Sequence, residues 1–164
     1  MPAITTQQAI TPFLWFDTQA EEAAKLYTSI FPNSRILEIT RYGDAGPGPK
    51  GGVMTVSFEL NGQRFTALNG GPQFKFTEAI SFVVNVESQQ EVDALWSRLT
   101  ADGGAESQCG WLKDRFGLSW QITPNALMRL LADPDREKSQ RVMQAMLGMR
   151  KIDIAGLERA YEGR

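Results

Sequence analysis

Few side chains in this sequence can do chemistry, and the count that restricts them most is that of histidine. The chain of 164 residues contains no histidine. Histidine is the commonest metal ligand and the usual acid–base group near neutral pH. We therefore exclude a zinc or iron site of the usual kind and a Ser/His/Asp triad. A carboxylate-only magnesium or calcium site is still possible, but the sequence has no EF-hand loop or other dense acidic loop.

Cys109, the single cysteine, is the one candidate nucleophile. A reactive thiol needs a helix N-terminus, a histidine or nearby cations to lower its pKa. Lys113 and Arg115 are near in sequence, but they belong to a predicted turn, where Asp114 and Arg115 are expected to form a solvated ion pair. A small, half-buried structural thiol is the simpler interpretation of Cys109, and catalysis is the alternative.

A second group of polar and aromatic side chains lies in a strong break that begins at Asn69-Gly70-Gly71-Pro72. Strand-like segments precede and follow this break. Gln73, Phe74 and Lys75 lie within it and supply an amide, an aromatic ring and a cation. This mixture suits the mouth of a cavity, and it suits plain surface equally well.

Length and charge indicate one globular domain with an ordinary core. The net charge is −2 and no long basic run exists, so a nucleic-acid partner is not expected. The apolar stretches are shorter than the ~20 residues of a membrane helix, so no membrane partner is expected either. Residues 1–12 lack the regions of a signal peptide. The single cysteine fits a reducing cytoplasm, where we expect the protein to be located.

The first half of the chain reads as a strand, a helix and three strands. Residues 11–17 are typical of a buried strand, and Thr18 with Glu21 matches a capping box at a helix start. Asn61-Gly62 is a strong hairpin signal. The three strands are expected at 34–43, 53–60 and 63–69. A Gly/Pro-rich hairpin loop at 43–52 joins the first two of them.

The second half repeats this order. A strand at 80–86 is followed by a second capping box, Ser88 with Glu91, and by a helix with an apolar stripe. A shift of 69 residues superimposes Tyr27 on Trp96, although the two capping boxes miss this register by one residue. We interpret the halves as a structural repeat; two unrelated strand–helix pairs are the alternative.

After Thr123 the pattern becomes helical. Thr123-Pro124 and Asp133-Pro134 each predict a helix start, and the helix after Asp133 carries Met143 and Met146 on its apolar face. A methionine stripe is typical of a core or a subunit interface.

Four segments together resemble the vicinal oxygen chelate (glyoxalase/bleomycin-resistance) superfamily, and within it the PhnB-like branch that is often labelled demethylubiquinone 3-methyltransferase-like. They are PFLWFDTQAEEAAKLYTSIFPNSRI, RYGDAGPGPKG, FTALNGGPQFKFTEAISF and QCGWLKDRFGLSWQITP. The resemblance implies an α+β fold of two βαβββ modules with curved mixed sheets around a cavity, and a homodimer. We place module 1 at about 10–70, module 2 at about 78–123, and a C-terminal helical extension at 124–164, all in one domain.

Metal-dependent members of that superfamily place one ligand on each of four strands. By the resemblance these places fall at Pro12, Asn69, Ser81 and Gln121 in this chain. A proline has no ligand side chain, and serine and neutral amides bind divalent ions weakly. We therefore expect no metal and no other cofactor.

The methyltransferase label receives no support from the residues. A nucleotide-type cofactor site needs a strand, a glycine-rich turn and a helix N-terminus. The glycine-rich segment 43–52 also contains prolines and precedes a predicted strand. A phosphonate role would need clustered arginines, and the cations here are dispersed.

Strand alternation then predicts which side chains line the cavity. If Pro12 faces inward, so do Leu14 and Phe16, while Phe13 and Trp15 pack beneath the helices. The predicted ligand-binding residues, which form an apolar pocket with a few amides and hydroxyls, are Leu14, Phe16, Asn69, Gln73, Ser81, Asn85, Trp111 and Gln121.

Three functions follow. The first is a metal-independent homodimer that binds a small organic molecule in the cavity between the modules. The second is an enzyme, a lyase, isomerase or transferase, that uses Cys109 or the pocket amides. The third is a protein–protein role for the methionine-rich C-terminal helices.

Overall fold

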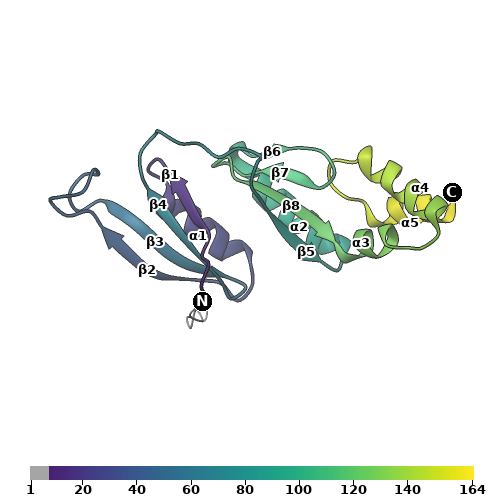
Figure 1. Ribbon diagram of the computed structural model, residues 1–164, viewed down its shortest axis with the longest axis horizontal. Helices are drawn as coiled ribbons and strands as arrows, with labels where there is room; N and C mark the ends of the chain where they lie inside the picture. The colour runs from purple at the N-terminus through teal and green to yellow at the C-terminus, as the bar shows by residue number, and fades with distance from the viewer. Residues whose placement is uncertain (1–7) are drawn as a thin grey trace, which may run out of the picture. The chain divides into compact units, whose positions relative to one another are not determined.

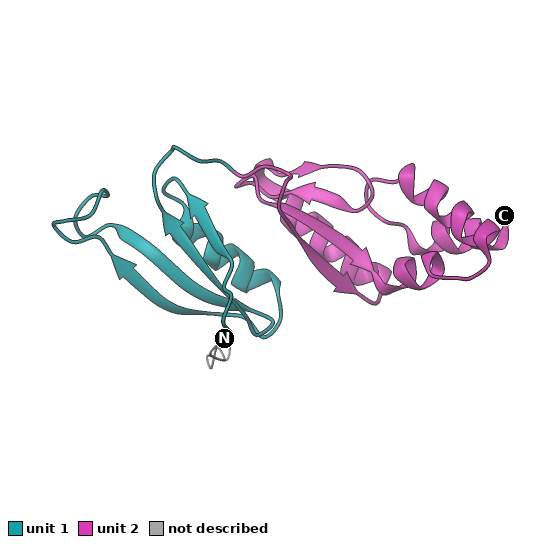
Figure 2. Ribbon diagram, viewed as in Figure 1, with its two compact units in different colours: residues 1–75 teal, residues 76–164 magenta. Residues whose placement is uncertain are grey.

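Figure 1 shows the computed structural model of the chain, which describes residues 8–164. Most of the segment 1–12, whose targeting features the sequence analysis considered, lies outside the described residues. The chain divides into two compact units, residues 1–75 and 76–164 (Figure 2).

Unit 1 contains one four-stranded sheet and one helix. Its strands have the order β1-β4-β3-β2, with β1 parallel to β4 and the other pairs antiparallel. The elements are β1 (Phe13–Phe16), α1 (Ala20–Ile30), β2 (Arg35–Arg41), β3 (Val53–Leu60) and β4 (Gln63–Asn69).

Unit 2 repeats this topology and then adds three helices. Its sheet has the order β5-β8-β7-β6, again with one parallel and two antiparallel pairs. The elements are β5 (Ser81–Val86), α2 (Gln89–Thr100), η1 (Ala101–Gly103), β6 (Ala105–Glu106), β7 (Trp111–Lys113), β8 (Ser119–Pro124), α3 (Asn125–Leu131), α4 (Arg136–Leu147) and α5 (Ile154–Glu162). The predicted α+β class with two βαβββ modules is confirmed.

The alternation along β3 shows how the sequence makes each sheet two-faced. Val56 and Phe58 are fully buried and lie on the face that packs against α1. The intervening polar residues, such as Ser57, point to the opposite face. Tyr27 of α1 is fully buried and its ring lies 6.2 Å from that of Phe58. Burial of each large apolar side chain contributes about 1.5–3 kcal/mol.

The turn predicted at Asn61-Gly62 is confirmed. Leu60 pairs with Gln63, so the two residues form the whole loop between β3 and β4. Both adopt positive φ angles, 48° at Asn61 and 80° at Gly62, as the tight hairpin turn requires.

The helix starts were predicted less well. The capping box of Ser88 and Glu91 is present at the start of α2. The box predicted at Thr18 is wrong, because α1 begins after Gln19, whose side chain makes no capping bond. The start predicted at Asp133-Pro134 is also wrong, because Asp135 caps α4 and accepts bonds from the amides that follow it.

The C-terminal helices are built into unit 2. Their core contains Leu127, Val142, Ile152 and Leu157, all nearly or fully buried. The Gln89 side chain of α2 donates to the Ile152 carbonyl at 3.0 Å and accepts from the Ile154 amide at 2.8 Å. The extension is therefore hydrogen-bonded to the second βαβββ module. None of the helices described in residues 8–164 is both long and apolar enough to cross a membrane.

Tyr161 links α5 to the segment before α4 and makes stability there depend on pH. Its hydroxyl donates to the Asp133 carboxylate at 2.6 Å. This bond lowers the pKa of Asp133 from its ordinary 3.8 and raises the pKa of Tyr161 from its ordinary 10.0. The stabilisation is therefore complete between these values, is lost as pH falls through the lowered Asp133 pKa, and is lost as pH rises through the raised Tyr161 pKa.

We expect Tyr161→Phe to lower the melting temperature most between about pH 5 and pH 9, and progressively less towards either extreme. Thermal melts of the wild type and the variant, taken within this range and beyond both of its ends, measure the difference. Tyr42→Phe is the matched control, because the Tyr42 hydroxyl donates to a carbonyl, that of Asn69, which does not titrate. A Tyr161→Phe effect that stays constant with pH would contradict the assignment.

Candidate functional site

The two faces of the first sheet differ in what covers them. Leu14 and Phe16 are 6% and 3% exposed and belong to the face packed on α1, whereas Phe13 is 59% exposed on the other face. The prediction that Leu14 and Phe16 face the cavity while Phe13 and Trp15 lie beneath the helix was therefore wrong. It placed Pro12 inward, and a one-residue error reverses every side chain of a strand.

The face of unit 1 that lacks α1 is called here the open face. Strand register arranges its residues in three rows across the sheet. The rows are Arg35, Glu59 and Arg64; Glu38, Ser57, Thr66 and Phe13; and Thr40, Thr55, Leu68 and Trp15. This face is thus mostly hydroxyl-bearing and charged, with two aromatic residues contributed by β1.

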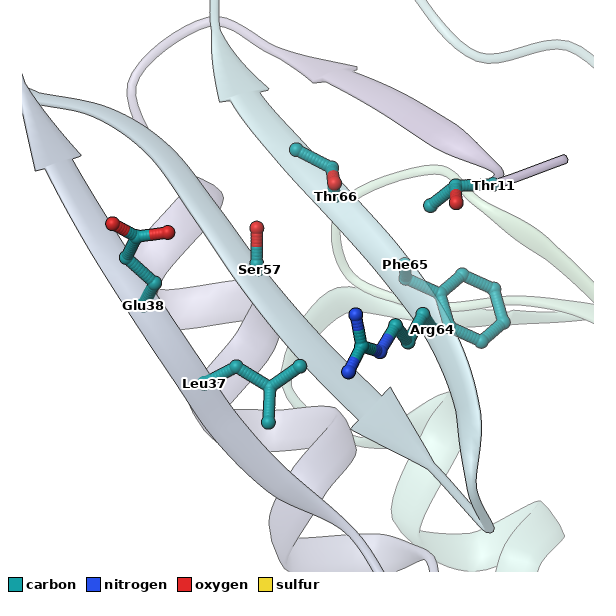
Figure 3. A pocket seen from close by; sticks show the side chains of 7 residues that line it. All are labelled: Thr11, Leu37, Glu38, Ser57, Arg64, Phe65 and Thr66. Atoms are coloured by element: carbon teal, nitrogen blue, oxygen red, sulfur yellow. The ribbon is translucent and has the colours of Figure 1, made fainter. Parts of the chain in front are cut away.

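A pocket of about 550 Å³ lies on the open face. Figure 3 shows the side chains around it, from β2, β3, β4 and the residues before β1. The lining residues are Thr11, Leu37, Glu38, Ser57, Arg64, Phe65 and Thr66. Phe65 belongs to the face packed on α1, where it forms part of the buried row with Phe58. The two rings stack with 5.4 Å between their centroids. The remaining six supply three hydroxyls, one carboxylate, one guanidinium and one aliphatic side chain.

Charged side chains beside the pocket alternate in sign across neighbouring strands. Glu59 of β3 lies between Arg35 and Arg64, with Nε–carboxylate distances of 3.2 Å and 3.5 Å. The Glu38 side chain makes no hydrogen bond or ion pair with any residue from 8 to 164. Its carboxylate is therefore available to another molecule.

The aromatic end of the open face is organised by Trp15. Its Nε1 donates to the Gly71 carbonyl at 2.9 Å, and the Phe74 ring meets it edge-on at 5.0 Å. The segment after β4 therefore packs on Trp15, and this segment includes the predicted binding residue Gln73, which is exposed. Phe74 is 65% exposed despite this contact.

Asn69 holds three backbone segments together. Its side-chain oxygen accepts from the Ala20 amide at 2.8 Å, which caps α1 from β4, and its nitrogen donates to the Val53 carbonyl at 3.2 Å. Its carbonyl accepts from the hydroxyl of Tyr42 at 2.5 Å. The predicted binding residue Asn69 thus has its amide engaged in the fold.

The glycine-rich segment 43–52 is folded against Tyr42. A Cβ at Gly46 or Gly48 would lie 2.5 Å or 2.3 Å from the Tyr42 ring, so only glycine allows the backbone to approach this closely. The segment closes by a hydrogen bond from the Tyr42 amide to the Gly52 carbonyl, and β3 follows directly. Its glycines therefore serve the packing of a hairpin loop.

Unit 2 has its own face opposite α2, and it brings together four of the predicted residues. Ser81, Asn85, Trp111 and Gln121 all project from the side of the sheet opposite the buried Trp120 and Ile122. Gln121 donates to the Ser81 hydroxyl at 2.8 Å, and Trp111 is its register partner on β7. The assignment of faces in this half was correct. A binding role for these residues is still a prediction.

Asp114, in the turn between β7 and β8, lies in surroundings that differ from expectation, whereas Cys109, just before β7, is half-buried as expected. Asp114 is 2% exposed, so the prediction that its carboxylate is solvated is wrong. Its carboxylate accepts from the Leu118 amide and from Trp120 Nε1, at 3.1 Å and 2.9 Å. Cys109 is partly buried with φ of 56°, and its amide donates to the Met149 carbonyl at 2.8 Å. Its backbone is thus fixed by the C-terminal extension.

The metal positions implied by the resemblance hold no suitable donor set. The Asn69 amide is bonded to backbone groups, and Ser81 and Gln121 are bonded to each other. Within residues 8–164, no cluster of three or more cysteines and carboxylates has a geometry that could hold a metal ion.

The pocket residues were missed by the sequence analysis, although a signal for them existed. In the segment from Thr55 to Leu60, polar and apolar residues alternate strictly, and the polar positions Thr55, Ser57 and Glu59 all lie on the open face. The same alternation in β4 marks Arg64 and Thr66. A prediction of the two faces from polarity alone would have found them.

Comparisons with known proteins agree with the fold. The family model described as 3-demethylubiquinone-9 3-methyltransferase matches residues 8–123. A PhnB protein from Bacillus cereus is 40% identical with a TM-score of 0.65, over 71% of this chain and 99% of its own. Protein PA1353 from Pseudomonas aeruginosa is 22% identical with a TM-score of 0.59, over 72% of this chain and 98% of its own. The comparison with curated proteins finds no match.

The engagement of Asn69 predicts a structural effect. We expect Asn69→Ala to lower the free energy of unfolding by about 1–2 kcal/mol, because a helix cap and a second hydrogen bond are lost. Urea unfolding measures the change. Asn85→Ala, the same substitution at an exposed position of β5, is the control and should change stability by less than about 0.5 kcal/mol. Equal stabilities for the two variants would show that the Asn69 bonds contribute little.

Proposed function

The chain belongs to the PhnB-like, 3-demethylubiquinone-9 3-methyltransferase family, whose model covers residues 8–123, and we propose that it binds a small organic molecule without a metal ion. The ligand binds in the pocket on the open face of unit 1. The observation that carries the proposal is this pocket of about 550 Å³, which lies on a sheet whose other face is filled by α1.

The volume and the chemistry of the pocket support a small ligand. Ligand sites are commonly concave, with a volume of about 300–1,000 Å³ and a few polar groups that fix orientation. Ser57, Thr66 and Glu38 provide such groups from three adjacent strands. Ser57 and Thr66 are register partners on regular hydrogen-bonded strands, so their backbone spacing is fixed and their ordering on binding costs little.

Metal independence is part of the proposal because the donors available are poor ligands. Divalent ions prefer several carboxylates or imidazoles. Glu38 is the single carboxylate among the pocket-lining residues, and the chain has no histidine. A reducing cytoplasmic location, inferred from the lone cysteine, belongs to the same proposal.

Methyl transfer, the activity named in the family description, has less support. The glycine-rich segment 43–52 packs on Tyr42 and leads into β3, whereas a nucleotide-type cofactor site needs a helix N-terminus at that point. The second candidate function is an enzyme of another class acting on the same ligand. Glu38 favours it, because an unpaired carboxylate beside a bound molecule can take a proton.

The proposal predicts that blocking the pocket abolishes binding. A library of small polar compounds, screened by chemical shifts of the backbone amides, should give hits that shift Ser57 and its neighbours. Ser57→Leu should weaken each hit at least about tenfold, because the larger side chain occupies the pocket. Ser97→Leu, on the exposed side of α2, is the control. Hits that are unaffected by Ser57→Leu would contradict the proposed site.

We also propose that the chain forms a homodimer. Support comes from large apolar side chains that unit 2 exposes, such as Val83 at 50% and Leu147 at 60%. Light scattering coupled to size exclusion should give a mass near twice the 18.2 kDa of one chain. A mass of one chain at micromolar concentration would contradict the dimer.

A further inference from the structure

The polar groups of the pocket differ in what they can donate and accept. The Glu38 carboxylate only accepts hydrogen bonds and the Arg64 guanidinium only donates them. Thr11, Ser57 and Thr66 carry hydroxyls, which do both. A ligand that satisfies all of them must therefore present both donors and acceptors. The hydroxyl group is the simplest ligand group that does so.

The charges of the pocket cancel. Glu38 and Arg64 carry one charge each of opposite sign, and the adjoining Arg35 and Glu59 form a second balanced pair. An anionic ligand would be repelled by Glu38, and a cationic ligand by Arg64. Neither sign of net charge is therefore favoured, and a neutral ligand avoids the desolvation cost of an ion.

Apolar groups lie at both ends of the central row of the open face, which consists of Glu38, Ser57, Thr66 and Phe13. Leu37 lines the pocket beside Glu38, and Phe13 follows Thr66 in the register at the other end, 59% exposed. Three strand spacings of about 4.8 Å separate the two edge strands, so the row is about 14 Å long. The pocket occupies part of this row, which leaves room for a ring with hydroxyls on its rim and C–H groups on its face.

We propose that the ligand is a net-neutral, hydroxyl-rich cyclic compound of the monosaccharide or cyclitol type, held by Glu38, Ser57, Arg64 and Thr66. The inference rests on the function proposed above and specifies its ligand class. Glu38 accepts bonds from ligand hydroxyls, Arg64 donates to ligand oxygens, and Leu37 contacts the C–H groups of the ring.

Six-membered rings of similar size and different polarity test the ligand class. The probes are myo-inositol and methyl β-D-glucopyranoside as polyols, cyclohexanol as the apolar ring, and cyclohexanecarboxylate and cyclohexylamine as the charged rings. Each is titrated into the isotope-labelled full chain, and the amide shifts of Glu38, Ser57 and Thr66 give its affinity. At least one polyol should bind more tightly than all three other rings.

The variant Glu38→Gln distinguishes specific binding of the polyols from nonspecific binding of any ring. The variant keeps the shape of the side chain but removes a charge-assisted hydrogen bond, so polyol affinity should fall about tenfold while cyclohexanol affinity stays unchanged. Glu158→Gln, on an exposed position of α5 in unit 2, is the matched control and should leave both affinities unchanged.

The outcomes distinguish this inference from the function on which it rests. If a charged ring or cyclohexanol binds in the pocket more tightly than the polyols, the ligand class is wrong and the binding function stands. If the polyols bind but Glu38→Gln has no effect, the class is also overturned. If none of the five probes shifts the pocket amides in the millimolar range, the ligand class is overturned, and the library screen with Ser57→Leu decides the binding function separately.

Discussion

Each sheet in this protein packs one helix of its own module against one face, and this constraint determines where chemistry can occur. In unit 1, α1 covers Val56, Phe58 and Ala67, all fully buried. Because successive strand residues point to opposite faces, the residues between them must occupy the other face. The core and the open face are therefore specified by the same alternation.

Hydrogen bonds that fix the ends of the strands and the segments next to them make the open face rigid. Asn69 caps α1 and holds the start of β3, while Trp15 fixes the segment after β4 through the Gly71 carbonyl. The glycine-rich segment is packed against Tyr42, whose hydroxyl bonds to Asn69. These bonds lie at one end of the sheet and do not use the residues that line the pocket, so Glu38 and Ser57 are left for a ligand. Binding and folding thus depend on different side chains of the same strands.

The fold could be predicted from the sequence more completely than the site. The Asn61-Gly62 hairpin, the Ser88 cap and the repeat of two modules depend on local patterns and were confirmed. The capping of α1 depends on Asn69, which is 49 residues away from Ala20 and cannot be found from local patterns. The faces of β1 were reversed because four consecutive apolar residues, Phe13 to Phe16, carry no alternation. In β5 and β8 polar residues mark one face, and the prediction was correct there.

A crystal structure of the protein soaked with a mixture of small polar fragments tests the central claim most directly. The account predicts a bound molecule on the open face of unit 1, within hydrogen-bond distance of Ser57, Thr66 or Glu38, with α1 and the buried row unchanged. A pocket filled by the side chains of the protein itself, or fragments bound repeatedly elsewhere and never on this face, would contradict it.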